Sequence, residues 1–203
     1  MNVLCLDLEG VLIPEIWQAV AASTGVDGLQ KTTRDIPIYD DLMSFRLGLL
    51  DQNRITLSQI QKDIEKMDPL PGAIDFLGWA KERFQVAIIS DTFYEFAMPL
   101  IAKLGDPMLL CHHLLLDGDK IVGYRLRQSD PKRCSVRAFK SLDLKVVAAG
   151  DSFNDVSMLQ EANVGFFFKA PDAVLEQYPG YKLAASYEEL KTLIETWRIS
   201  QVS

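Results

Sequence analysis

The sequence predicts an α/β protein: a mostly parallel sheet with helices on both faces, and a small helical domain inserted after the first strand. Two observations predict the sheet. Short apolar runs recur along the chain and end in polar residues, and segments with helical periodicity separate these runs. A third observation predicts the insertion, because residues 14–70 keep an apolar period of about 3.6 residues and contain no convincing strand.

The first predicted strand covers residues 3–6, where four apolar residues in a row are typical of a strand buried on both faces. Asp7 and Glu9 follow it at once. Two residues apart on extended backbone, they point the same way, toward the crevice at the carboxyl ends of a parallel sheet. Gly10 would then let the chain turn away. Taken alone, this stretch also fits a capping Asp and a turn Gly.

The insertion follows directly. Pro14 suits the first turn of a helix, and apolar residues recur at helical spacing in three groups: Ile16, Trp17, Val20 and Ala21; Leu42, Phe45, Leu49 and Leu50; and Leu57, Ile60, Ile64 and Met67. The sequence therefore predicts a helical cap over residues 14–70. Residues 1–13 and 71–203 remain as a discontinuous core.

The core continues with alternating helices and strands. The expected elements are a helix from Pro71, a strand over 84–89 that ends in Ser90-Asp91-Thr92, a helix over about 93–104, a hairpin within 108–127 that turns at Asp117-Gly118-Asp119, a helix from Asp130-Pro131 that carries Lys132, strands over 145–149 and 164–168, and a helix over about 186–198. The third strand leads into Gly-Asp-Ser-Phe-Asn-Asp at 150–155.

Length and charge narrow the possible functions. At 203 residues the chain suits one core with an accessory element. The net charge of -7 opposes a nucleic-acid surface. There is no apolar run near the roughly 18 residues that span a bilayer, and the N-terminal strand lacks the basic start of a signal peptide, so we expect a cytoplasmic protein without a membrane partner.

Cysteines and histidines do not form a recognisable site. Cys5, Cys111 and Cys134 fit neither a disulfide framework nor zinc spacing, which indicates reduced thiols. His112 and His113 are adjacent, so on a strand they point apart, and a shared metal or catalytic role is not expected.

Polar residues at or just after the predicted strands can converge on one crevice. Asp7, Asp151 and Asp155 gathered together would repel one another unless a cation bound them, and all-oxygen ligands favour Mg²⁺. Since Mg²⁺ keeps water and phosphate oxygens in its shell, a phosphorylated ligand is the natural complement. The Lys132 ammonium, the Ser90 hydroxyl and the amides that follow Ser90 would bind the remaining phosphate oxygens.

The sequence also suggests the chemistry. No Cys-His pair lies near these positions, so the predicted nucleophile is Asp7, acting through an aspartyl phosphate. A second acid must protonate the leaving alkoxide and then deprotonate the incoming water or alcohol, and Glu9 is placed for that task.

These residues resemble the four motifs of the haloacid dehalogenase superfamily: Asp-Leu-Glu-Gly-Val-Leu at 7–12, Ser90 after a strand, Lys132, and Gly-Asp-Ser-Phe-Asn-Asp at 150–155. Their order matches as well. The resemblance implies a Rossmann-like three-layer α/β/α core with a helical cap of the first type. It also implies that the Glu9 carbonyl is a metal ligand beside Asp7, Asp151 and Asp155, and that Asp91, Thr92 and Asn154 help to bind substrate.

Within that superfamily the chain is most similar to phosphoserine phosphatases, whose cap carries a Glu and, farther on, an Arg. Glu15 and Arg46 fit those places, and they would bind the ammonium and the carboxylate of an amino acid. Tyr39 stands where the family places an apolar or aromatic residue over the substrate. From the residues alone, Glu15 could equally be a first-turn helix acid and Arg46 part of a solvated face.

Two of the motifs depart from the usual family pattern. Glu9 replaces an Asp, and Ser90-Asp91-Thr92 replaces Ser-Gly-Gly. Both departures, and the stretches 32–37 and 90–96, resemble a bacterial subgroup of phosphoserine phosphatases that are also homoserine phosphotransferases, enzymes of serine and threonine metabolism. The resemblance implies phosphoserine and homoserine as small-molecule partners. The enzyme class suggests a homodimer.

Two alternatives stay open at this point. One is a relative in the same superfamily that acts on another small phosphate ester. The other is a non-catalytic sensor of a phosphorylated ligand, suggested by the altered Glu9 and Asp91.

Overall fold

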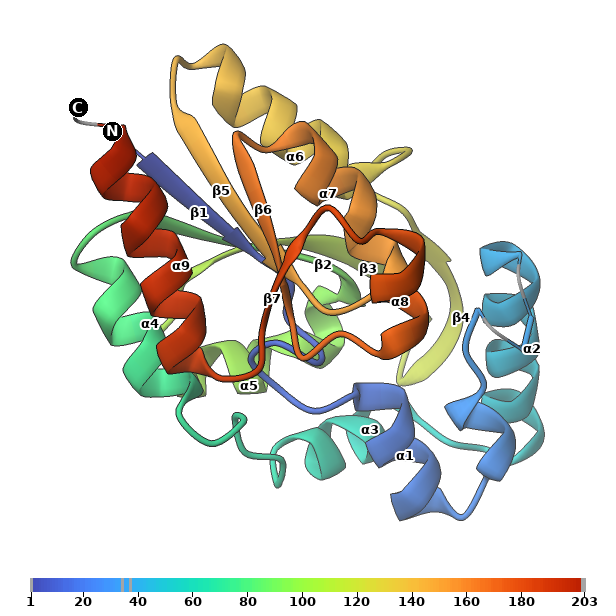
Figure 1. Cartoon of the computed structure of the whole chain (residues 1–203). Helices are drawn as coiled ribbons and strands as arrows, with labels where there is room; N and C mark the ends of the chain where they lie inside the picture. Colours follow the sequence, from blue (N-terminus) through green and yellow to red (C-terminus); the bar gives the residue numbers. More distant parts are fainter. Residues whose placement is uncertain (1, 34, 37, 202–203) are drawn as a thin grey trace.

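The computed structural model describes residues 2–33, 35–36 and 38–201, so Arg34 and Pro37 of the stretch 32–37 lie outside the described residues. Among those described, seven strands form one sheet in the order β4-β3-β2-β1-β5-β6-β7 (Figure 1). The strands are β1 (Asn2–Leu6), β2 (Gln85–Phe93), β3 (Met108–Asp117), β4 (Lys120–Arg125), β5 (Lys145–Gly150), β6 (Val164–Phe168) and β7 (Lys182–Ala184). Neighbouring strands of this sheet are parallel except β3 and β4, which form an antiparallel hairpin. The predicted fold class is confirmed.

Helices connect and cover these strands. The described helices are α1 (Ile16–Thr24), α2 (Tyr39–Gln52), α3 (Leu57–Ile64), α4 (Ala73–Lys81), α5 (Tyr94–Lys103), α6 (Pro131–Ser141), α7 (Val156–Glu161), α8 (Asp172–Gln177) and α9 (Tyr187–Ser200), with short 3-10 helices η1 (Asp27–Gln30) and η2 (Phe153–Asp155). Within the described part of the chain, no helix combines the length and the apolar character needed to cross a bilayer.

The sheet separates two apolar clusters, and β1 contributes to both. Leu4 and Leu6 belong to the cluster that includes side chains of α4, α5 and α9, whereas Val3 and Cys5 belong to the cluster that includes α6, α7 and α8. These four side chains are at most 2 % exposed. Successive residues of a strand point to opposite faces, so an uninterrupted apolar run fits a central strand covered on both sides. The end of β1 consequently lies near the middle of the carboxyl edge of the sheet.

Residues 14–70 contain α1, η1, α2 and α3, and no strand among those that are described. These helices, blue to teal in Figure 1, lie on the side of the sheet where β1 ends. Their apolar side chains join the larger cluster, as when the ring of Trp17 packs edge-on against Phe96 of α5 with centroids 5.4 Å apart. Helix α2 also contacts β4. The insertion therefore packs against the core close to the strand ends.

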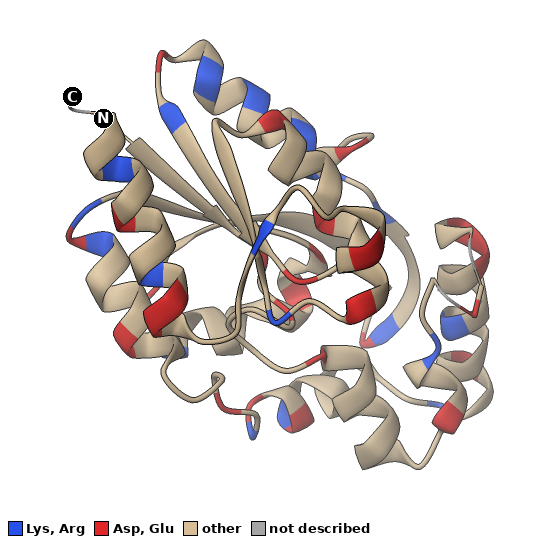
Figure 2. Cartoon of the chain, in the orientation of Figure 1, with Lys and Arg blue, Asp and Glu red and all other residues tan. Residues whose placement is uncertain are grey.

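Helix α6 carries several basic residues, coloured blue in Figure 2, and three of them are paired with acids. Arg133 lies 3.2 Å from Asp130, and Arg137 and Lys140 lie 3.1 and 3.6 Å from Glu161. Lys132, on the same helix, turns inward.

The second predicted strand ends earlier than the observed strand β2. It was expected to end at Ile89, but β2 continues through Ser90-Asp91-Thr92 to Phe93, and α5 begins at Tyr94. Ile89 pairs with Leu110 and Phe93 with His112, so four steps along β2 oppose two along β3 and the ladder carries an irregularity. The polar run looks like a strand end because the sequence does not reveal a ladder that resumes after a bulge. Helices α7 and α8 and the three-residue β7 were not predicted, and α4 begins at Ala73 rather than Pro71.

Candidate functional site

Asp7 lies at the carboxyl end of β1 and is 6 % exposed. Its N–H donates to the carbonyl of Ala149 on β5 at 3.0 Å, which fixes the chain as it leaves the sheet. Gly10 then adopts a φ of 75°, and a Cβ at this position would lie 2.4 Å from Asp151 Oδ2. Only glycine permits both the left-handed backbone and this close approach. Gly10 therefore brings the loop after β1 against the end of β5.

Three carboxylates meet at these strand ends. Asp7, Asp151 and Asp155 each offer an oxygen, and these oxygens lie within 4.8 Å of one another. Burial, followed by the charge of Asp155, raises the pKa of Asp7 well above its ordinary value and that of Asp151 to about 7. A bound cation would relieve this cost of ionisation. The three residues offer the all-oxygen donor set that a hard divalent ion prefers.

Asp155 is fully buried and already heavily hydrogen-bonded. Its Oδ2 accepts the backbone N–H groups of Asp151 (2.9 Å) and Ser152 (3.0 Å), and the Ser152 hydroxyl at 3.2 Å. A Cβ at Gly150 would lie 2.2 Å from Asp155 Cγ, so this carboxylate packs directly against the end of β5. Asp155 thereby shapes the loop that presents Asp151.

Lys132 supplies a buried positive charge to this cluster. It lies in the first turn of α6, is 3 % exposed, and its Nζ is 2.6 Å from Asp155 Oδ1 and 3.0 Å from Asp7 Oδ1. A third carboxylate oxygen, Asp91 Oδ2, lies 3.7 Å away. Burial would lower the pKa of Lys132, but its acidic neighbours outweigh burial and raise the pKa well above the ordinary value. Lys132 therefore carries its charge in the folded protein.

The irregular end of β2 faces the same crevice. Ser90 and Thr92 are 2 % and 4 % exposed, and the Thr92 N–H donates to Ser90 Oγ at 3.3 Å. The backbone carbonyl of Asp91 accepts the hydroxyl of Tyr39, the first residue of α2, at 3.4 Å. This hydrogen bond joins the core to the helical insertion.

Glu9 points toward the insertion rather than along the sheet edge. Its Oε1 accepts the backbone N–H of Ile16, the first residue of α1, at 2.7 Å. Burial, with a contribution from the charge of Glu15, raises the pKa of Glu9 to about 8. A carboxyl group with such a pKa holds its proton near neutral pH, as a general acid must.

A cavity of about 260 Å³ brings the predicted amino-acid ligands together with the motif residues. It is lined by Glu9, Glu15, Trp17, Gln18, Thr32, Thr33, Tyr39, Leu42, Arg46, Asp91, Thr92, Asp151, Ser152, Phe153 and Asn154. Eight of the predicted site residues are in this set, drawn from the insertion and from the ends of β1, β2 and β5. A second cavity of about 670 Å³ adjoins it and is lined by Lys132 and His112, with Tyr39, Asp91 and Asn154 common to both.

Arg46 is buried in this region rather than part of a solvated face. Its guanidinium lies 4.5 Å from the centre of the Trp17 ring and donates to the Lys31 carbonyl at 2.6 Å. Burial lowers the pKa of Arg46 to about 10. Its Nε has no hydrogen-bond partner among the described residues. An oriented guanidinium with an unused N–H is suited to an anionic ligand.

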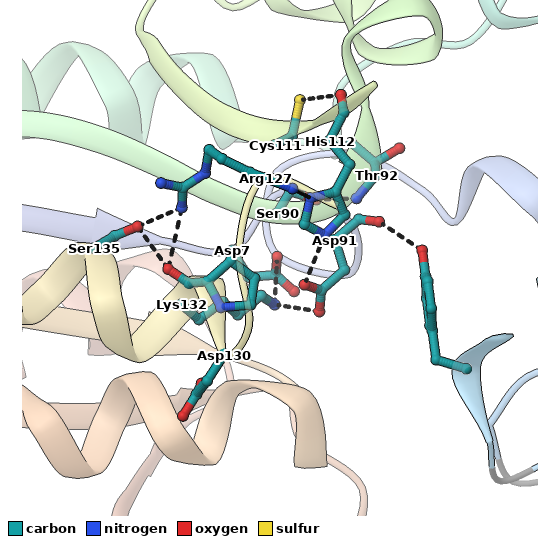
Figure 3. Close-up of polar contacts among 12 residues, drawn as sticks. Asp7, Ser90, Asp91, Thr92, Cys111, His112, Arg127, Asp130, Lys132 and Ser135 are labelled. Atoms are coloured by element: carbon teal, nitrogen blue, oxygen red, sulfur yellow. Dashed lines mark hydrogen bonds and ion pairs between the residues drawn. The ribbon is translucent and has the colours of Figure 1, made fainter. Parts of the chain in front are cut away.

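His112 is a site residue that sequence reasoning missed. Its Nε2 lies 3.7 Å from Asp91 Oδ1, and the side chain is 2 % exposed (Figure 3). His113 points away and lies 3.2 Å from Glu95, so the expectation that the two rings point apart is correct. Strand pairing could have identified His112. If the hairpin strand that carries both histidines lies beside Ser90-Asp91-Thr92, one of the two adjacent rings must face those residues.

Comparison with known proteins identifies relatives over almost the whole chain. The family model described as haloacid dehalogenase-like hydrolase matches residues 44–160. The chain is 56 % identical over 192 residues to phosphoserine phosphatase ThrH of Pseudomonas aeruginosa, covering 94 % of each protein. It is 54 % identical to a phosphoserine phosphatase of Pseudomonas syringae pv. tomato, covering 94 % of this chain and 81 % of the relative.

Solved structures agree with this relationship. A phosphoserine phosphatase from T. onnurineus superposes with a TM-score of 0.74 at 26 % identity, covering 95 % of this chain and 94 % of that one. A substrate-bound phosphoserine phosphatase superposes with a TM-score of 0.71 over 96 % of this chain and 97 % of that one, and its 17 % identity supports the fold alone.

Proposed function

Because the chain belongs to the haloacid dehalogenase-like hydrolases, a family of enzymes, we propose that it is a magnesium-dependent phosphoserine phosphatase that also transfers the phosphoryl group to homoserine. One observation carries this proposal. The buried Asp7, beside Lys132 and two further carboxylates, adjoins a cavity that also holds Glu15 and Arg46. The names of the two relatives support phosphoserine as the substrate.

Two displacements at phosphorus make up the proposed reaction. An oxygen of Asp7 attacks the phosphorus, the bond to the serine oxygen breaks, and Glu9 gives its proton to that oxygen. Water or the homoserine hydroxyl then attacks the aspartyl phosphate, its proton passes to the Glu9 carboxylate, and Asp7 is released. The products are serine with either inorganic phosphate or phosphohomoserine.

The donor set fits magnesium. Asp7, Asp151 and Asp155, with the carbonyl of Glu9, are the residues that would hold the ion, and Asp155 Oδ2 is meanwhile engaged by two backbone amides. When bound, Mg²⁺ would neutralise charge on the phosphoryl oxygens and allow the carboxylates to stay ionised. Lys132, Ser90 and the amides of Asp91 and Thr92 would bind the same group from the protein side, with Asn154 at the mouth of the cavity.

The other end of the substrate would lie within the insertion. Glu15 is assigned to the ammonium group and Arg46 to the carboxylate, with the Tyr39 ring over the carbon chain. Homoserine is serine with one more methylene, so the same two charges can hold it while its hydroxyl reaches the phosphorus.

The role assigned to residues 14–70 is that of a cap over residues 1–13 and 71–203. Its hinges would lie near Leu12–Pro14 and Pro69–Gly72, where Gly72 has a φ of 87°. A closed cap excludes water and so favours transfer to a bound alcohol over hydrolysis. The proposal places the reaction in the cytoplasm, where both amino acids are free small molecules.

Turnover of phosphoserine with Mg²⁺, with and without homoserine, tests this function when free phosphate and phosphohomoserine are both measured. We expect phosphate in both reactions and phosphohomoserine only in the second. Asp7→Asn, which keeps the shape of the side chain, should abolish both products, and EDTA should do the same reversibly. Full turnover by Asp7→Asn would refute the nucleophile, and preference for another phosphate ester would refute the substrate.

A further inference from the structure

His112 occupies a buried position on β3 beside the irregular end of β2. Its Nδ1 accepts the backbone N–H of Arg127 at 3.1 Å. Since Nδ1 accepts a hydrogen bond, the ring proton must be on Nε2. That nitrogen faces Asp91 Oδ1 at 3.7 Å (Figure 3). The imidazole is therefore held in the tautomer that presents an N–H to Asp91.

Asp91 links His112 to Lys132. One carboxylate oxygen faces the imidazole, and the other lies 3.7 Å from Lys132 Nζ. Burial would raise the pKa of Asp91, but the charge of Lys132 and the interaction with His112 outweigh burial and lower it. The side chain is therefore an anion beside the proposed phosphoryl site.

Arg127 closes this chain of contacts into a ring. Its guanidinium donates to Ser135 Oγ at 2.6 Å and to the Pro131 carbonyl at 3.1 Å, both on α6 (Figure 3). Lys132 lies in that same first turn of α6. The contacts thus run from α6 through Arg127, His112 and Asp91 back to Lys132. A closed set of contacts fixes the direction of the lysine more firmly than any one of them alone.

The Asp91 carboxylate creates a problem for phosphate binding. A carboxylate without another partner could approach the Lys132 ammonium more closely than the present 3.7 Å and would repel an incoming phosphate. The structure resolves this conflict by giving Asp91 a second partner on the side away from Lys132.

We propose that His112 is a positioning residue that holds Asp91 off the phosphoryl site and so keeps Lys132 available to the phosphate. The inference rests on the proposed function, because it concerns the phosphoryl end of the same site. In this proposal Asp91, which departs from the family motif, has a partner outside the motifs, namely His112 on the hairpin.

A mutant cycle in the full-length protein tests this role. His112→Phe keeps an aromatic ring and removes the N–H that faces Asp91 at 3.7 Å. Because this contact is longer than a hydrogen bond, we expect kcat/KM for phosphoserine to fall by roughly 3- to 10-fold, mainly through KM. His112→Gln retains a donor at similar reach and should recover most of that loss. His113→Phe on the opposite face of β3 is the matched control and should change activity by less than about twofold.

The second arm of the cycle separates positioning from stability. In an Asp91→Gly background there is no carboxylate to hold. Adding His112→Phe should then lower kcat/KM by less than a further twofold or so. Equal losses in both backgrounds, or equal losses from His112→Phe and His113→Phe, would overturn the proposal. Thermal unfolding is measured for each variant. If His112→Phe does not fold, His112→Asn takes its place, because its shorter side chain does not reach Asp91.

Running the cycle on two substrates distinguishes this inference from the proposed function. Coupling seen with p-nitrophenyl phosphate but no turnover of phosphoserine would refute the substrate and uphold the role of His112. Turnover of phosphoserine without coupling between His112 and Asp91 would uphold the substrate and refute the role of His112. If neither ester is hydrolysed, calorimetric affinity for inorganic phosphate with Mg²⁺ gives the same cycle, and additive losses there again reject the role.

Discussion

Shortening Glu9 to Asp tests how the core controls the helical insertion. Glu9 Oε1 accepts the Ile16 N–H at 2.7 Å, and Ile16 begins α1. Loss of one methylene withdraws the carboxyl group by about 1.5 Å, so this separation would reach about 4.2 Å, which is too long for a hydrogen bond. The Glu9 carboxyl group holds its proton near neutral pH, so this is a hydrogen bond between neutral groups, worth about 0.5–1.5 kcal/mol. The closed arrangement of α1 should therefore become roughly 2- to 10-fold less favoured in Glu9→Asp.

The assay is the ratio of phosphohomoserine to free phosphate at fixed phosphoserine and homoserine. A looser α1 admits water, so we expect this ratio to fall by about 2- to 10-fold in Glu9→Asp, with faster hydrogen exchange in the first turn of α1. Glu9→Gln is the matched control, because it keeps the length and can still accept from Ile16 but cannot transfer a proton. It should slow both products without faster exchange. Wild-type partition and exchange in Glu9→Asp would refute the reasoning.

Three further changes test other parts of the site. Arg46→Lys keeps the charge but loses the planar fork, so KM for phosphoserine should rise about 10- to 100-fold. KM for p-nitrophenyl phosphate, which lacks a carboxylate, should change less than about twofold. Equal rises in KM for the two substrates would contradict the assignment of Arg46 to the carboxylate. Gly10→Ala places a Cβ 2.4 Å from Asp151 Oδ2 and should weaken Mg²⁺ binding by about tenfold or more in calorimetry, whereas Gly78→Ala in α4, with nothing within 4 Å of the new Cβ, should bind normally. The pKa of Glu9 is raised from 4.5 to about 8, so the folded protein binds this proton more tightly and Glu9 costs stability as pH rises through that interval. Metal-free Glu9→Gln should therefore lose less stability than wild type between those pH values in thermal unfolding, and parallel curves would reject the shift.

The sequence was informative where local pattern determines structure. The apolar run before Asp7 identifies a strand buried on both faces, and parallel strands bring their carboxyl ends to one edge. Those two facts were enough to predict that Asp7, Asp151 and Asp155 meet, and the structure brings them within 4.8 Å. The catalytic and binding roles of these residues stay predictions until the variants are measured.

Tertiary contacts set the limit of that reasoning. The direction of the Glu9 side chain depends on an N–H of α1, and the place of Ser90-Asp91-Thr92 depends on a ladder that resumes at His112. Neither partner is visible from the motif itself. The sequence argument excludes a role shared by His112 and His113, because adjacent side chains on a strand point apart. One of the two can still face a site alone.

The residues at the two departures from the family motifs both contact the insertion. The Glu9 side chain accepts a hydrogen bond from the first residue of α1, and the backbone carbonyl of Asp91, which any residue at this position would supply, accepts one from Tyr39, the first residue of α2. Each residue next to the phosphoryl site is thus attached to the start of a different helix of the insertion. An enzyme that passes a phosphoryl group to an alcohol must keep water away during the exchange of serine for homoserine. Hydrogen bonds from the reacting loops to both helices would couple the state of the phosphoryl site to the position of the insertion, so Glu9→Asp and Tyr39→Phe should each favour hydrolysis. If the two acted independently their effects on partition would add, and a combined effect smaller than the sum would show that they hold one closed state.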